Sequence, residues 1–234
     1  MITIKNVTKK YKTQKEDVIA LNDISLTLPS KGLIGLSGEN GCGKSTLLNL
    51  ISTYDIEFEG NIFIDNIDIK SNENFIKKDI ISYMMQDDLF VKNLNVEENI
   101  KLINSNNELV ENQIRSFDIL SKKNKYAYEL SGGQKQRVSM IISFLKKYDI
   151  LLVDEPTCSL NEEMEIEVFK ILKEIAKEKL VILVSHNKSL LKENCQMIVY
   201  LHDGKLTDVV LNNFNNIVYN ENVITFNNHI NFND

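Results

Sequence analysis

The sequence is poor in several residue types that would point to particular protein classes. Its 234 residues include no tryptophan, two prolines and three cysteines. The cysteines, Cys42, Cys158 and Cys195, are odd in number and show no paired spacing, which argues against a disulfide framework and a zinc site. Free thiols of this kind fit a reducing compartment.

Long hydrophobic runs and a leader segment are also missing. The longest apolar runs, such as residues 150–153 and 180–184, are far too short to span a bilayer. Residues 1–5 show no apolar region of a signal peptide. We therefore expect a cytoplasmic chain that reaches a membrane only through a partner.

The charge is modest and acidic overall. The net charge is −6, with 26% charged and 43% hydrophobic residues, which are ordinary values for a globular protein. A chain of this charge lacks the basic footprint of a nucleic-acid-binding protein, so we expect no nucleic-acid partner. The length fits one large domain, or one domain with an added lobe.

Hydrophobic periodicity predicts strands and helices in alternation. Strands are predicted at residues 2–11 (an edge strand), 19–28, 33–36, 80–84, 150–153 and 180–184, with a strand pair at 61–69 and a hairpin at 197–210. Helices are predicted at residues 44–52 and 162–178, and residues from about 87 to 147 are helix-prone. This order predicts a mostly parallel α/β sheet with an inserted helical lobe.

A glycine-rich loop joins the strand at 33–36 to the helix at 44–52. It reads Gly38-Glu39-Asn40-Gly41-Cys42-Gly43-Lys44-Ser45-Thr46 and matches the pattern GxxxxGK[ST]. Its glycines allow a tight turn whose N–H groups, with the positive end of the helix, can cradle phosphates. Lys44 adds a charge on the same oxygens, Ser45 offers a hydroxyl to Mg²⁺, and Thr46 is placed to reach a phosphate oxygen. At the variable position, we expect Cys42 to act as a small residue rather than a reactive thiol.

Two adjacent acids follow the apolar strand at 150–153. Asp154 is placed to hold Mg²⁺ through its water shell. Glu155, one residue further on, is placed to orient or deprotonate an attacking water. A pair of acids at a strand exit is common by itself, and it is the phosphate loop upstream that favours the catalytic interpretation.

Residues 130–134, Leu-Ser-Gly-Gly-Gln, open a predicted helix and form a second candidate anion site. Ser131 suits the helix N-cap, and the two glycines after it let the backbone approach an anion. A capped Ser-Gly-Gly turn would explain this segment in isolation. Two phosphate-binding motifs can contact one γ-phosphate only if they approach it from opposite sides. This indicates two chains that face each other head to tail.

Together these motifs resemble the ATP-binding cassette, the nucleotide-binding subunit of ABC transporters. The resemblance covers about residues 2–210 and rests on the Walker A loop (38–46), the signature (130–134) and the Walker B strand with Glu155. Weaker matches are Gln86 at the Q-loop, the switch histidine His186, and Tyr11 at the position that stacks on adenine. The implied fold is a P-loop NTPase of the α/β class, with a mostly parallel core sheet, an antiparallel β subdomain and a helical subdomain at about 87–147.

The resemblance also implies an ATPase with Mg²⁺ as cofactor, in which two cassettes sandwich two ATP molecules. Lys44, Glu155 and His186 would be catalytic. ATP would be bound by Tyr11, Gly38, Glu39, Asn40, Gly41, Cys42, Gly43, Lys44, Ser45, Thr46 and Gln86. Mg²⁺ would be held by Ser45, Gln86 and Asp154. The ATP of a partner subunit would be contacted by Ser131, Gly132, Gly133 and Gln134.

One position departs from the family pattern. The D-loop after Walker B usually carries an aspartate, and this sequence has Asn161 at that place. Asparagine keeps the hydrogen-bonding capacity of aspartate and loses its charge. We expect ATP hydrolysis to survive, with altered communication between the two sites.

Features of the sequence outside these motifs narrow the choice of cassette subfamily. No transmembrane segment is fused to the chain, so we expect a separate permease that holds the cassette on the inner face of the cell membrane. The cassette body most resembles the lipoprotein-release and macrolide-export group, which includes resistance pumps for antimicrobial peptides. An importer cassette and a soluble cassette ATPase with an assembly or regulatory role remain alternatives. Nothing in the sequence names a transported substrate.

The predicted domain organisation is a cassette at residues 1–210 followed by an Asn-rich extension at 211–234. Apolar residues are scattered through this extension among asparagines. It is compatible with a small strand pair, with packing on a partner cassette, or with a poorly ordered tail.

Overall fold

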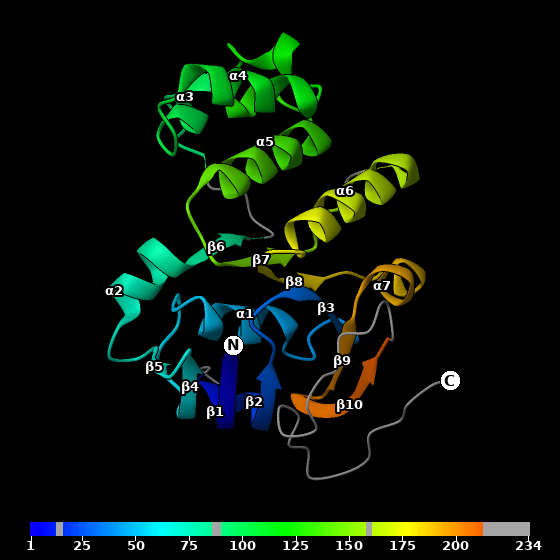
Figure 1. The fold of residues 1–234 in the computed structure, drawn as a ribbon. Helices are drawn as coiled ribbons and strands as arrows, with labels where there is room; N and C mark the ends of the chain where they lie inside the picture. Colours follow the sequence, from blue (N-terminus) through cyan, green and yellow to red (C-terminus); the bar gives the residue numbers. More distant parts are fainter. Residues whose placement is uncertain (13–15, 86–89, 158–160, 213–234) are drawn as a thin grey trace.

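The computed structural model describes residues 1–12, 16–85, 90–157 and 161–212 of the chain. The described residues form two sheets, helices that pack on them, and a lobe of helices at the top of Figure 1. The expectation for the tail falls on residues 213–234, outside the described residues. Among the described helices, none combines the length and the apolar character needed to cross a membrane.

The larger sheet has six strands in the order β10-β9-β3-β8-β7-β6. Neighbouring strands run parallel, except that β10 is antiparallel to β9. Its strands are β3 (Gly32–Ser37), β6 (Ile81–Met84), β7 (Ile150–Asp154), β8 (Leu180–Val184), β9 (Met197–His202) and β10 (Lys205–Leu211). Every residue of β3, β7 and β8 is buried, which explains why these strands are almost continuously apolar.

The smaller sheet is antiparallel, with four strands in the order β2-β1-β4-β5. Its strands are β1 (Ile2–Lys12), β2 (Asp17–Leu28), β4 (Glu59–Ile64) and β5 (Ile67–Asp68). The expectation of an edge strand at residues 2–11 is wrong, because Ile2 pairs with Leu28 on one side and with Ile64 on the other. The second pairing joins segments far apart in the chain, and no local pattern marks it.

Helices arrange the two sheets in layers. α1 (Lys44–Ile51) packs between the sheets, while α6 (Glu162–Ile175) and α7 (Lys188–Asn194) cover the other face of the larger sheet (Figure 1). Alternating strand residues supply both layers, because successive side chains point to opposite faces. Leu152 joins the core that contains α1, and Leu151 joins the core beneath α6.

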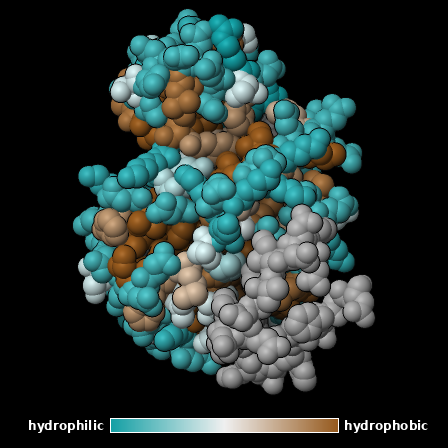
Figure 2. All heavy atoms as spheres, viewed as in Figure 1, coloured by the Kyte–Doolittle hydropathy of each residue, from teal (hydrophilic) through white to brown (hydrophobic). Residues whose placement is uncertain are grey.

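The helical lobe has a hydrophobic core of its own. It contains α3 (Val96–Lys101), α4 (Asn107–Ser116) and α5 (Gly132–Leu145). Its buried core residues are Val96, Ile100, Val110, Ile114, Ile119, Leu130, Val138 and Ile141. Asn95, Asn106 and Ser131 cap the three helices. Hydrophilic side chains cover most of the top of the lobe and the visible side of α6 (Figure 2).

The α/β fold class is confirmed, and apart from the position of β1 in its sheet the differences concern short elements. α2 (Glu73–Phe75) and the π-helical turn Ile76–Ile80 precede β6, so Ile80 ends a helical turn rather than opening a strand. The sequence also did not predict α7. Such segments are too short to show a full amphipathic period, which is the signal that reveals a helix.

Candidate functional site

The glycine-rich loop runs from β3 directly into α1, and its backbone needs glycine. Gly38, Gly41 and Gly43 have φ angles of 153°, 81° and 103°, which side-chain-bearing residues rarely adopt. A Cβ atom on Gly43 would lie 2.5 Å from the carbonyl oxygen of Ala20. No side chain caps the N-terminus of α1, so its backbone donors face the loop as an anion-binding end.

Lys44 is buried within this loop. Its ammonium donates to the carbonyl oxygens of Gly38 at 2.9 Å and of Glu39 at 2.8 Å. The sulfur of Cys42 lies 3.9 Å from the same ammonium, and the Cys42 side chain is part of the apolar core, as expected of a small packing residue. The loop therefore holds a cation at the place where phosphate oxygens would bind.

A cavity opens in front of this loop. Its volume is about 290 Å³, and its lining consists of Asn40, Gly41, Gly43, Lys44, Ser45, Thr46 and Glu155. The Walker A residues and the acid after β7 therefore face one space. This placement allows a phosphate on the loop and a water near the carboxylate to meet.

Asp154, the last residue of β7, is almost fully buried beside the loop. Burial raises the pKa of Asp154 above its usual range, and a hydrogen bond with the Ser45 hydroxyl opposes this rise. Within the described residues, the Oδ1 atom of Asp154 is buried without a hydrogen-bond partner. An oxygen of this kind beside a hydroxyl fits a divalent cation that completes its shell with phosphate oxygens and water. Among the described residues, no group of three or more His, Cys, Asp or Glu side chains could hold a metal ion.

Glu155 is fixed from several sides. It has φ +50°, and its backbone N–H donates to the carbonyl oxygen of Val184 at 3.1 Å. The side-chain amide of Gln136 donates to the Glu155 carbonyl oxygen at 3.0 Å. The Oε1 atom of Glu155 lies 2.8 Å from Nε2 of His186. The structure therefore brings together the two predicted catalytic residues that follow β7 and β8.

Tyr11 lies at the end of β1, close to the phosphate loop. Burial raises the pKa of its phenol, and a hydrogen bond with Thr46 of the loop opposes the rise. Its hydroxyl also donates to Oδ2 of Asp55 at 3.3 Å. The ammonium of Lys9 lies 4.7 Å from the Tyr11 ring centroid and 2.7 Å from Oδ2 of Asp55. An ion pair whose lysine is buried thus supports Tyr11, a residue that remains 37% exposed.

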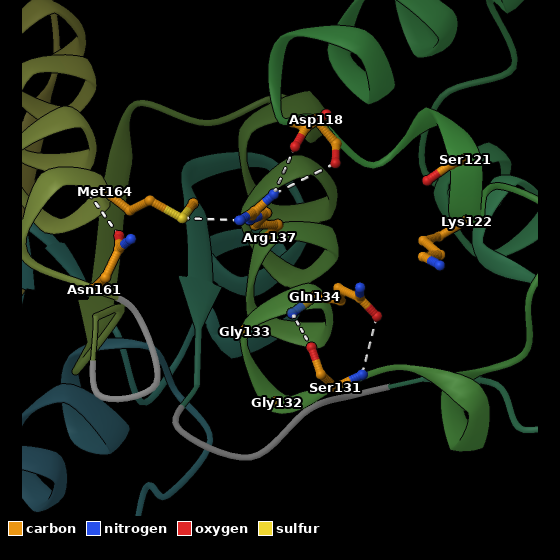
Figure 3. A pocket seen from close by; sticks show the side chains of 10 residues that line it. All are labelled: Asp118, Ser121, Lys122, Ser131, Gly132, Gly133, Gln134, Arg137, Asn161 and Met164. Carbon is orange, nitrogen blue, oxygen red and sulfur yellow. Dashed lines mark hydrogen bonds and ion pairs between the residues drawn. The ribbon is translucent and has the colours of Figure 1, made fainter.

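The signature segment lies in a different pocket. Ser131 caps α5, with its hydroxyl accepting from the N–H of Gln134, while the Gln134 side chain accepts from the N–H of Ser131 (Figure 3). The pocket has a volume of about 750 Å³ and is lined by Asp118, Ser121, Lys122, Ser131, Gly132, Gly133, Gln134, Arg137, Asn161 and Met164. None of these residues lines the cavity in front of Lys44. The described residues therefore form two separate candidate phosphate-binding ends.

Three residues of this neighbourhood were missed by the sequence reasoning. They are Gln136, Lys9 and Asp55, and none of them belongs to a sequence motif. Gln136 bonds to Glu155 and Lys9 bonds to Asp55, and each pair is far apart in the chain. Lys9 gave one signal that could have been used. It is a charged residue at an inward-facing position of a strand whose other inward residues are apolar. Gln86, expected at the site, falls within residues 86–89, outside the described residues.

Comparison with known proteins agrees with this arrangement. Residues 21–158 match the family described as ABC transporter. An uncharacterized ABC transporter ATP-binding protein of Methanocaldococcus jannaschii, MJ0796, is 31% identical over 88% of this chain and 95% of its own length. The lipoprotein-releasing system ATP-binding protein LolD of Rickettsia bellii is 32% identical over 81% of this chain and 90% of its own length.

A solved structure shows the same architecture. The dimeric post-hydrolysis state of the ATP-binding cassette MJ0796, bound to ADP and phosphate, superposes with a TM-score of 0.83 at 27% identity. The superposition covers 89% of this chain and 97% of that chain. The chain therefore belongs to the ATP-binding cassette family of ABC transporters. It is an ATPase subunit of the kind that dimerises and works with a transmembrane permease.

Proposed function

We propose that this chain binds ATP with Mg²⁺ between its own phosphate loop and the signature of a second cassette. One observation carries the proposal: among the residues that the structure describes, the cavity at Lys44 and the pocket at Ser131 share no lining residue. One chain offers half of each ATP site, so two chains facing head to tail complete both sites. Identical copies or a related cassette would satisfy this geometry.

Each residue of the site has a distinct part in this proposal. The N–H groups of the loop and Lys44 bind the phosphates, and Tyr11 stacks on the adenine ring. Ser45 and Asp154 hold Mg²⁺, with Gln86 as a further ligand on the strength of the family resemblance. Mg²⁺, when bound, neutralises negative charge on the phosphates.

Hydrolysis follows from the residues around the cavity. Glu155 accepts a proton from the attacking water, and His186 holds the Glu155 carboxylate and contacts the γ-phosphate. Ser131, Gly132, Gly133 and Gln134 contact the γ-phosphate bound to the partner, using the anion-binding end of α5. The signature therefore acts on a nucleotide that its own chain does not hold.

The first experiment is Mg-ATP hydrolysis by the purified chain beside Lys44→Ala and Glu155→Gln. We expect activity to be lost in both variants, and Glu155→Gln to form an ATP-dependent dimer. Unchanged activity in Glu155→Gln would contradict the assignment of the general base. A Glu155→Gln chain that remains monomeric at saturating Mg-ATP would show that the sandwich needs another partner.

A mixing experiment tests the arrangement in trans. Lys44→Ala disables the loop, and Gly133→Asp disables the signature, so each variant alone has two dead sites. In a mixed dimer, one site combines an intact Lys44 with an intact Gly133. We expect the mixture to regain activity that neither variant shows alone, and no regain would contradict the head-to-tail sandwich.

For the whole complex we propose an exporter or mechanotransmitting role for peptides, lipids or antimicrobials. The supporting observation is the likeness to LolD, which extends over most of both chains. The cassette would be held at the inner face of the membrane by its permease. The test is to co-purify the chain with its membrane partner and follow transport in inverted vesicles. ATP-driven loss of substrate from the vesicle interior would favour an importer instead.

A further inference from the structure

We propose that Gln136 is a positioning residue for Glu155, and that α5 thereby sets the catalytic base of its own chain. The proposal rests on the assignment of Glu155 as general base. Gln136 itself does not touch the nucleotide cavity, whose lining it does not join. Its effect on hydrolysis passes through the backbone of Glu155.

The Glu155 backbone adopts a conformation that an ordinary residue avoids. Its φ of +50° lies in the left-handed region, which is strained for a residue with a Cβ atom. Such a conformation persists where the surroundings over-determine it. Two hydrogen bonds do so here, one on each side of the residue: from its N–H to Val184 and from Gln136 to its carbonyl oxygen.

The bond from Gln136 is well placed to act on the side chain of Glu155. Gln136 is 8% exposed, and its Nε2 lies 3.0 Å from the Glu155 carbonyl oxygen. Without this hydrogen bond the Glu155 backbone could leave its left-handed conformation, which would redirect the Cα–Cβ bond and move the carboxylate away from His186. A misplacement of about 1 Å is enough to lower a rate by about 100-fold.

The same helix also carries the signature. Ser131 caps α5, and Gln136 follows on the next turn of that helix. In the proposed dimer, the phosphate bound by the partner contacts Ser131 at the start of α5. The Glu155 base of the same chain is held by Gln136 on the next turn of α5, so one rigid helix touches both groups. A shift of α5 would lengthen or shorten the Gln136 bond and alter the base.

A purely structural role for Gln136 makes a different prediction. A buried carbonyl oxygen costs free energy unless it is paired, so loss of Gln136 would then lower stability and loosen the whole lobe. A positioning role predicts a loss of kcat with nucleotide binding intact. The two readings are separated by measuring both quantities on the same variants.

The experiment uses Gln136→Leu, which keeps the side-chain bulk and removes the donor. Gln136→Glu, in which a carboxylate oxygen would face the carbonyl, is the second variant in case leucine prevents folding. Gln113→Leu makes the same chemical change on α4 and is the matched control (Figure 1). For each variant we would measure kcat and KM for Mg-ATP and the thermal unfolding midpoint. The ATP-dependent dimer would be measured in a Glu155→Gln background.

We expect Gln136→Leu and Gln136→Glu to lower kcat by about tenfold, with KM changed by less than about twofold. The ATP-dependent dimer should match that of the control, while the unfolding midpoint should fall modestly, because each change leaves the buried carbonyl oxygen of Glu155 without its donor. In the Glu155→Gln background, adding Gln136→Leu should lower the single-turnover rate of ATP hydrolysis by less than about twofold. The reason is that both changes act through the same group, the Glu155 carboxylate.

Two results would overturn the inference. One is a kcat within about twofold of the wild type in whichever Gln136 variant folds. The other is joint loss of stability, nucleotide binding and dimer, which is the structural outcome. Full activity of Glu155→Gln alone would instead contradict the assignment of the base, so failure of the inference and failure of the proposed function are distinguishable.

Discussion

The Nε2 atom of His186 lies 2.8 Å from Oε1 of Glu155, although the two residues are 31 positions apart in the chain. They follow β7 and β8, which run parallel and adjacent in the larger sheet. Because parallel strands end at the same edge of a sheet, residues just beyond each strand meet there. The topology thus builds a carboxylate–imidazole pair, and its carboxylate residue, Glu155, lines the cavity in front of the phosphate loop.

The first prediction concerns this pair. His186→Ala should lower kcat by about 100-fold, since Glu155 loses the group that orients it and the phosphate loses a contact. Binding of a fluorescent ATP analogue should change little, because the loop and Lys44 are untouched. His202→Ala, a change at another exposed histidine, is the control and should hydrolyse ATP at the wild-type rate. Equal rates for the two variants would contradict a catalytic role for His186.

The second prediction separates two glycines of the phosphate loop. A Cβ atom on Gly43 would meet the Ala20 carbonyl at 2.5 Å, whereas one on Gly41 meets nothing within 4 Å in the described structure. Both have positive φ, so both substitutions cost backbone strain of about 1 kcal/mol. Gly43→Ala should therefore lower the unfolding midpoint well below that of Gly41→Ala. Equal midpoints in urea or thermal unfolding would show that the close approach to Ala20 does not constrain the loop.

The third prediction concerns the ion pair beneath Tyr11. Lys9 and Asp55 are 4% and 22% exposed, and Asp55 also accepts the Tyr11 hydroxyl. Asp55→Asn should lower the free energy of unfolding by about 3 kcal/mol, because it leaves the buried ammonium of Lys9 without a counter-charge. Loss of the ring's support should raise KM for ATP by about fivefold, equivalent to ~1 kcal/mol, with kcat little changed.

The control for this prediction is an exposed ion pair between β1, the strand that carries Lys9, and the neighbouring strand β4. Lys10 and Glu59 are 46% and 71% exposed, so Glu59→Gln should change the stability by less than about 0.5 kcal/mol. A rise in KM in Glu59→Gln equal to that in Asp55→Asn would mean that the effect comes from the net charge of the sheet. An unchanged KM in Asp55→Asn would remove the proposed support of Tyr11.

The motif residues could be predicted from the sequence because their chemistry is local. The glycine-rich loop, the start of the signature helix and the acid pair after β7 each need particular residues at a fixed spacing. Lys44, Ser131 and Asp154 can therefore each be recognised from the sequence alone. The partners that hold these groups are not visible in this way. Gln136 reaches Glu155 across 19 positions and Lys9 reaches Asp55 across 46, and only the folded chain brings each pair together.

The same limit applies to the fold. The apolar strands β7 and β8 are predictable, since burial on both faces demands continuous hydrophobic residues. The place of β1 within its sheet is not, because pairing with β4 depends on a chain reversal through α1. Short elements such as α7 carry too little periodicity to be recognised.

The last prediction tests the departure at the D-loop. Asn161 caps α6 by accepting from the N–H of Met164 at 3.1 Å, and it lines the signature pocket with Ser131 (Figure 3). Aspartate caps a helix as well as asparagine does, so Asn161→Asp should leave stability within about 0.5 kcal/mol of the wild type. The change therefore adds a charge to the pocket without disturbing the fold.

We expect this charge to change the ATPase rate by about threefold, as ~0.7 kcal/mol from a partly screened charge would do. Asn106→Asp makes the same change at the cap of α4 and should keep the wild-type rate. Asn161→Ala removes the helix cap and should lower the free energy of unfolding by about 1 kcal/mol. This variant therefore measures the effect of losing the cap without adding a charge. If Asn161→Asp matched both the wild type and Asn106→Asp in rate and in the ATP dependence of that rate, the missing charge would have no part in communication between sites.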